Sequence, residues 1–141
     1  MNSSSEQSDK HRQLVLTSDF SRLEEAVDEA EAFYTRHIED EEFVYKIVLL
    51  TSEAVTNAME HGNKLDVSKS VFVDFILNDK ACEVWVRDEG RGFDRSRIAD
   101  PLAGDQLYSD GGRGIFLIEE LADEVRFEEN GCKLGMIFHR T

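Results

Sequence analysis

Three groups of residues in this chain have types and spacings suited to binding and transferring a charged group. The first is the pair Glu53 and Asn57, which lie four residues apart in an otherwise apolar stretch. In a helix both side chains point the same way, and His61 follows four residues later. A carboxylate without a partner is costly to bury. The pair therefore indicates either a functional site or a polar strip at the edge of a buried helix face.

The second group follows a predicted strand. Asp88 is in phase with the apolar alternate residues of 82–86, so its side chain is expected to face the core and to need a hydrogen-bond donor. Gly90 and Gly92 come next, at a spacing that lets the backbone approach a ligand closely. A loop that follows the hairpin and binds no ligand would show the same pattern.

The third group is the glycine-rich stretch of residues 111–114. Gly112 and Gly114 precede a predicted helix, and free N–H groups at a helix start form a natural phosphate site. The glycine spacing and the missing Gly-Lys-Ser/Thr exclude a Walker loop and a dinucleotide fingerprint. A hinge without a ligand remains an alternative here. Arg113 and Lys64 are candidate phosphate contacts, and plain surface positions would explain both equally well.

Hydrophobic periodicity and turn residues predict the elements that carry these groups. They are a strand at 14–16, a helix opened by a Ser21–Glu24 capping box, a helix over about 40–60 ended by Gly62, strands at 71–77 and 82–86, an irregular loop at 93–110, a helix at 112–121 and a hairpin around Asn130 and Gly131. This order predicts an α+β two-layer sandwich, with a mainly antiparallel, mixed sheet covered on one face by helices. Residues 1–12 are expected to be a flexible tail and 13–141 one domain.

Composition narrows the classes of partner. The chain has 141 residues, and 16 Lys and Arg against 30 Asp and Glu give a net charge of −14. This balance argues against nucleic acid and against an anionic membrane surface. Cys82 and Cys132 lack the spacing of a metal site, so we expect reduced thiols in a cytoplasmic protein. The sequence contains no apolar run of membrane-spanning length and no leader-like start.

The order E-x-x-x-N, D-x-G-x-G, loop, G-x-G-x-x-L resembles the ATP-binding domain of the GHKL superfamily, the Bergerat fold of gyrases, histidine kinases, heat-shock chaperones and mismatch-repair ATPases. The resemblance covers about residues 14–140 and implies three helices on one face of the sheet. Residues 53–62 and 114–118 are similar to the pattern of the bacterial anti-sigma factor serine kinases. One departure is that Met136 follows Gly135, where this fold commonly has a Gly-Thr pair.

The resemblance implies a role for each group. Glu53 would be the general base that deprotonates a serine hydroxyl or a water, Asn57 would ligate Mg²⁺, and Asp88 would accept a hydrogen bond from the adenine amino group of ATP. The glycines would line the nucleotide, with Gly90 and Gly92 at adenine and Gly112 and Gly114 at the phosphates, under a lid over about 93–111. Arg113 would be a further nucleotide contact.

The resemblance also implies partners. The chain would phosphorylate a STAS-type anti-sigma factor antagonist and sequester a sigma factor, and the resemblance is also compatible with a homodimer. One alternative is a non-catalytic ATP-binding regulator, against which Glu53 argues, since a pure binder needs no base. Another is a histidine-kinase catalytic domain, which needs an acceptor histidine on a helical hairpin that His11 and His37 do not provide.

Overall fold

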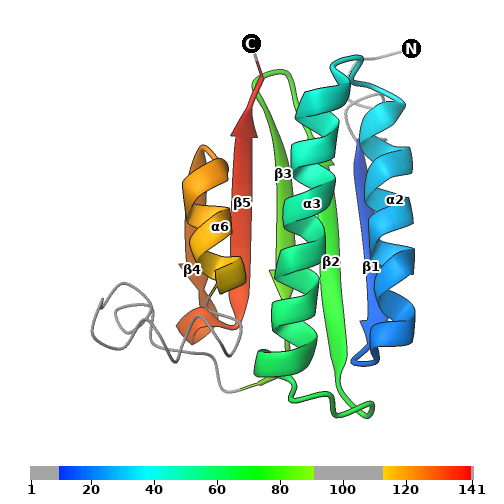
Figure 1. Cartoon of the computed structure of the whole chain (residues 1–141), viewed down its shortest axis with the longest axis vertical. Coiled ribbons are helices and arrows are strands. Elements are labelled where there is room, and N and C mark those ends of the chain that lie inside the picture. The colour runs from blue at the N-terminus through cyan, green and yellow to red at the C-terminus, as the bar shows by residue number, and fades with distance from the viewer. Residues whose placement is uncertain (1–9, 91–112, 141) are drawn as a thin grey trace.

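The protein consists of one sheet with helices packed on one face (Figure 1). The computed structural model describes residues 10–90 and 113–140, with Arg113 described by its backbone only. The strands in this part of the chain are β1 (His11–Thr17), β2 (Ser70–Leu77), β3 (Ala81–Arg87), β4 (Glu124–Glu128) and β5 (Lys133–His139). Their order across the sheet is β1-β2-β3-β5-β4, and each neighbouring pair is antiparallel.

Among the described residues the helices of the second layer are α2 (Leu23–Thr35), α3 (Glu41–Asn57) and α6 (Arg113–Leu121). Their buried side chains and the inward residues of the strands form one apolar core. Tyr34 on α2 joins the layers, because its hydroxyl lies 2.6 Å from the carbonyl oxygen of Glu83 and 3.2 Å from that of Ile76. The predicted α+β sandwich is confirmed.

Aspartates cap the short 3₁₀ turn before α2 and the start of α3. The predicted capping box is wrong, because the Asp19 carboxylate accepts the N–H of Ser21 at 2.9 Å. A short 3₁₀ turn, η1 (Phe20–Arg22), then leads into α2 without a side-chain cap. Asp40 caps α3 by accepting from Glu42 and Phe43, which satisfies backbone donors that the helix itself cannot.

The long helix ends differently from the prediction. A π-helical turn, η2 (Ala58–Gly62), follows α3. The N–H of Asn63 donates to the Ala58 carbonyl at 2.8 Å, which is an i to i+5 bond. Lys64 and Leu65, with φ of 55° and 58°, adopt the left-handed conformation after the turn, and Gly62 does not. The predicted conformational role of Gly62 as a helix terminator is therefore wrong.

The predicted last hairpin is confirmed. Its turn, η4 (Glu129–Gly131), has positive φ at all three residues, including 59° at Asn130 and 92° at Gly131. Met136 is fully buried in the core. It therefore places a thioether in the core at the position where the sequence resemblance implies a threonine hydroxyl.

In the described part of the chain, no helix combines the length and apolar character needed to cross a membrane. Cys82 and Cys132 are both free thiols. Burial raises the pKa of the Cys82 thiol to about 11, whereas Cys132 is only half-buried.

Candidate functional site

The predicted site residues that the structure describes lie at one end of the molecule. The end of α3, the end of β3 and the start of α6 meet there, at the lower end of Figure 1. Segments from three separate parts of the sequence therefore contribute to one site.

Glu53 and Asn57 are half-buried on α3 and lie about 6 Å apart along the helix axis, at 1.5 Å per residue. The start of α6 packs beside Glu53. Gly114 is buried, and a Cβ added there would lie 2.9 Å from Glu53 Oε1. A side chain at 114 would therefore displace the carboxylate. The glycine leaves room for the Glu53 carboxylate in its present position, which the phosphate-loop pattern alone did not reveal.

His61 lies within η2, four residues after Asn57. Its Nε2 is buried, has no hydrogen bond among the described residues and lies 3.5 Å from Glu60 Oε1. We interpret His61 as a structural residue of the turn.

Asp88 is 6% exposed, as the strand phase predicted. Desolvation raises the pKa of its carboxyl, and the N–H of Gly90 opposes that shift. This N–H donates to Oδ1 at 2.8 Å. Within the described parts of the chain, no hydrogen bond to the other oxygen, Oδ2, is formed. One carboxylate oxygen thus fixes the loop.

Asp88 can lie against the π-turn that follows α3 because two neighbouring residues are glycines. A Cβ on Gly62 would overlap the Asp88 carboxylate, and a Cβ on Gly90 would overlap the carbonyl oxygen of Gly62. The D-x-G loop and the helix end therefore interlock at van der Waals contact. Sequence reasoning named Gly90 for ligand approach, whereas the structure shows that it also packs against Gly62.

Asn63 is the main residue that sequence reasoning missed. Its side chain is 1% exposed and bonds to three strand ends. Asparagine is common at helix ends, so its type and position in the sequence give no signal of this burial.

Several predicted residues cannot be placed. Gly92, Gly112, the Arg113 side chain and the lid over 93–111 lie outside the described residues. Lys64 is exposed in the turn after η2, and its role as a phosphate contact stays a prediction.

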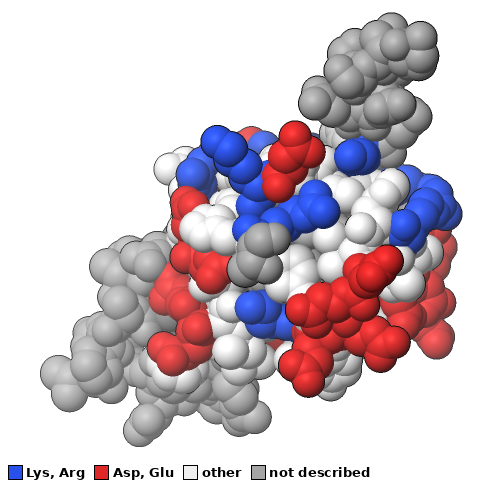
Figure 2. All heavy atoms as spheres, turned by 90° about the horizontal axis from the view of Figure 1, so that it is seen from above, with Lys and Arg blue, Asp and Glu red and all other residues white. Residues whose placement is uncertain are grey.

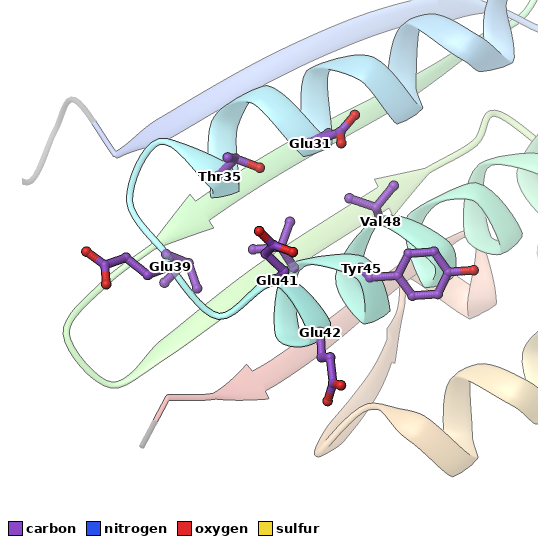
Figure 3. A pocket seen from close by; sticks show the side chains of 9 residues that line it. Glu31, Thr35, Glu39, Glu41, Glu42, Tyr45 and Val48 are labelled. Atoms are coloured by element: carbon purple, nitrogen blue, oxygen red, sulfur yellow. The ribbon is translucent and has the colours of Figure 1, made fainter.

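A second hollow, of about 770 Å³, lies between the end of α2 and the start of α3, away from these residues (Figure 3). Its lining includes Glu31, Glu39, Glu41 and Glu42 around the apolar Val44 and Val48. Figure 2 shows this end of the molecule, where acidic side chains form a large patch. Four carboxylates would repel the phosphates of a nucleotide. The hollow is therefore unsuited to that ligand.

Comparison with known proteins identifies the family of this chain. The family model described as "Histidine kinase-like ATPase domain" matches residues 16–138. The chain belongs to this family. The match contains Glu53, Asn57, Asp88 and Gly114, so the cluster at the end of α3 is part of an ATPase-type domain.

Curated relatives are similar over a shorter stretch. Serine-protein kinase RsbW of Bacillus subtilis (strain 168) is 38% identical over 89 residues, which are 58% of this chain and 55% of the relative. RsbW of Bacillus licheniformis is 37% identical over 99 residues, 62% and 59% of the two chains. RsbW of Listeria monocytogenes serotype 4a (strain HCC23) is 30% identical over 102 residues, 67% and 65% of the two chains. The matched region thus spans less than two thirds of these relatives.

The residues present fit a magnesium nucleotide. The side-chain oxygen of Asn57 is a hard ligand of the kind that Mg²⁺ prefers, and this ion keeps several waters when bound through few protein oxygens. Asp88 offers a buried acceptor beside two glycines that leave no side chain in the way. In residues 10–90 and 113–140 there is no cluster of three or more His, Cys, Asp or Glu that could hold a metal on its own.

Proposed function

We propose that this domain is an ATP-dependent, Mg²⁺-dependent protein-serine kinase that acts as an anti-sigma factor. The observation that carries the proposal is the placement of Glu53, one turn from Asn57 and beneath Gly114, where a methyl group would meet its carboxylate. A nucleotide-binding regulator needs no base at this position. The relatives are named serine-protein kinases, which agrees with this chemistry.

In the proposed reaction Glu53 accepts the proton of a serine hydroxyl. The serine oxygen forms a bond to the γ-phosphorus of ATP, the bond from that phosphorus to the β,γ-bridging oxygen breaks, and ADP leaves. Such a reaction depends on positioning and charge neutralisation more than on covalent chemistry by the protein. The rigid helix that carries Glu53 and Asn57 supplies the positioning.

Asn57 would hold Mg²⁺, which neutralises phosphate charge when it is bound. Backbone N–H groups near Gly112 and Gly114 would hold the phosphates. The domain would thereby bind an anion despite its net charge of −14. Asp88 would accept the adenine amino group through Oδ2. We expect Asp88→Asn to weaken nucleotide binding by about 1–3 kcal/mol.

The proposed phosphorylation substrate is a STAS-type antagonist, and the sequestered partner is a sigma factor. Phosphate on the antagonist would break its complex with this acidic chain through repulsion and desolvation. A cytoplasmic location belongs to the same proposal, because sigma factors act in the cytoplasm. The homodimer rests on the family resemblance. These partners rest on the family resemblance and not on a contact within the fold.

The test is incubation with γ-labelled ATP, Mg²⁺ and antagonist-like proteins encoded near this gene. We expect transfer to a serine, loss of transfer when EDTA removes Mg²⁺, and no transfer by Glu53→Gln, although this variant still binds ATP. Glu42→Gln, at the far end of α3, is the matched control and should be as active as the wild type. Binding of ATP without transfer to any candidate would favour the regulator, and unchanged transfer by Glu53→Gln would refute the role of this residue.

A further inference from the structure

Asn63 lies directly beneath the Asp88 loop and joins the helix layer to the sheet. Its Nδ2 donates to Ser18 Oγ at 2.7 Å and to the Ser70 carbonyl oxygen at 3.0 Å. Its Oδ1 accepts the N–H of Glu89 at 2.8 Å. Both amide protons and an oxygen lone pair are therefore used inside a site that is closed to water.

The chemistry of the partners fixes which way the amide points. The Ser70 carbonyl can only accept and the Glu89 N–H can only donate, so a rotated Asn63 amide would oppose like groups at both contacts. An aspartate would keep the acceptor and lose the donors, and an apolar residue would lose all three bonds. The site therefore specifically requires an asparagine.

The three successive N–H groups of residues 88–90 are all held. The Asp88 N–H donates to the Cys132 carbonyl at 2.8 Å, and the Gly90 N–H donates to Asp88 Oδ1. The bond between Glu89 and Asn63 is the one that reaches the segment following α3. It sets the Asp88 loop relative to the helix that carries Glu53.

We propose that Asn63 is a positioning residue for nucleotide recognition, which holds the backbone beside Asp88 so that Oδ2 faces the base. The inference rests on the proposed function of Asp88 as the acceptor of the adenine amino group. Asn63 acts through the Glu89 N–H and does not touch the nucleotide.

The test compares ADP and GDP binding by calorimetry in three variants of the full chain. Asn63→Ala removes the bond to Glu89, and we expect ADP binding to weaken about 5- to 10-fold, with a smaller preference for ADP over GDP. Asn63→Asp keeps an acceptor for the Glu89 N–H but places a carboxylate oxygen against the Ser70 carbonyl, so it should retain more of the ADP preference than Asn63→Ala while it loses stability. Ser18→Ala is the matched control, because it breaks the same buried network but leaves the Glu89 bond intact.

Thermal unfolding separates positioning from stability. We expect Asn63→Ala and Ser18→Ala both to lower the melting temperature, and only the former to change the ADP to GDP ratio. If Asn63→Ala does not fold, Asn63→Ser, whose shorter side chain does not reach Glu89, takes its place. An unchanged ratio in the Ala or Ser variant, or an equal change in Ser18→Ala, would overturn the inference. Asp88→Asn shows whether the inference about Asn63 fails alone or together with the proposed role of Asp88. Normal ADP binding by that variant would overturn the role of Asp88 as well.

Discussion

Replacing Gly62 by alanine tests whether the end of α3 is shaped by the Asp88 carboxylate. Gly62 has no positive φ, so alanine fits its backbone conformation, and only the available space excludes it. The three atoms closest to an added Cβ all belong to the carboxyl group of Asp88. This carboxylate cannot move aside freely, because its Oδ1 is bonded to the Gly90 N–H.

The expected cost follows from these contacts. Overpacking a tight site costs about 1–3 kcal/mol, and loss of a hydrogen bond to a charged group costs about 1.5–3 kcal/mol. The better helix propensity of alanine returns up to about 1 kcal/mol. We therefore expect Gly62→Ala to lower the free energy of unfolding by about 1.5–6 kcal/mol and to weaken ADP binding.

A double-mutant cycle in urea identifies the cause. In the Asp88→Ala background the obstructing atoms are gone, so Gly62→Ala should have little effect or stabilise slightly. The coupling free energy should exceed about 1 kcal/mol, well above the ~0.3–0.5 kcal/mol within which independent sites add. An equal penalty in both backgrounds would refute the steric account of Gly62.

Three further predictions concern titration, packing and thiol exposure. Because burial raises the pKa of Asp88 above its ordinary 3.8, the folded chain binds this proton more tightly than the unfolded chain. Stability should therefore fall as pH rises from 3.8 through the raised pKa and then level off, a fall that urea titrations of Asp88→Asn should lack. ADP affinity should rise over the same range, as the acceptor ionises. Tyr34→Phe should lower the free energy of unfolding by about 1–2 kcal/mol, measured in urea, because two strand carbonyls lose their shared donor. In a thiol-reagent assay Cys132 should react first and the buried Cys82 only on unfolding, and a fast phase that persists in Cys132→Ser would contradict this order.

Local patterns in the sequence predicted the layers, the hairpins and the burial of Asp88. Alternation within β3 continues to the strand end, so the phase of Asp88 could be read directly from its neighbours. The reason for a glycine at position 62 could not be predicted in this way, because the group that requires it is a carboxylate 26 residues later. Likewise, nothing near Asn63 in the sequence identifies Ser18 or Glu89 as its partners. The residue types at positions 62 and 63 are determined by contacts with distant segments, and local periodicity in the sequence does not reveal those contacts.

The π-helical turn has a consequence for insertions and deletions in this part of the chain. Each residue in an α-helix rotates the chain by about 100°. A π-turn closes over one residue more than a turn of α-helix. Inserting a further residue into η2 would therefore rotate Asn63 by about 100° away from the strand ends and separate Gly62 from Asp88. Deleting one residue would let α3 continue as a regular helix with the turn still closed, so the contacts of the Asp88 loop should tolerate a deletion better than an insertion. The length of this segment, as much as the identity of its residues, sets where the helix meets the sheet.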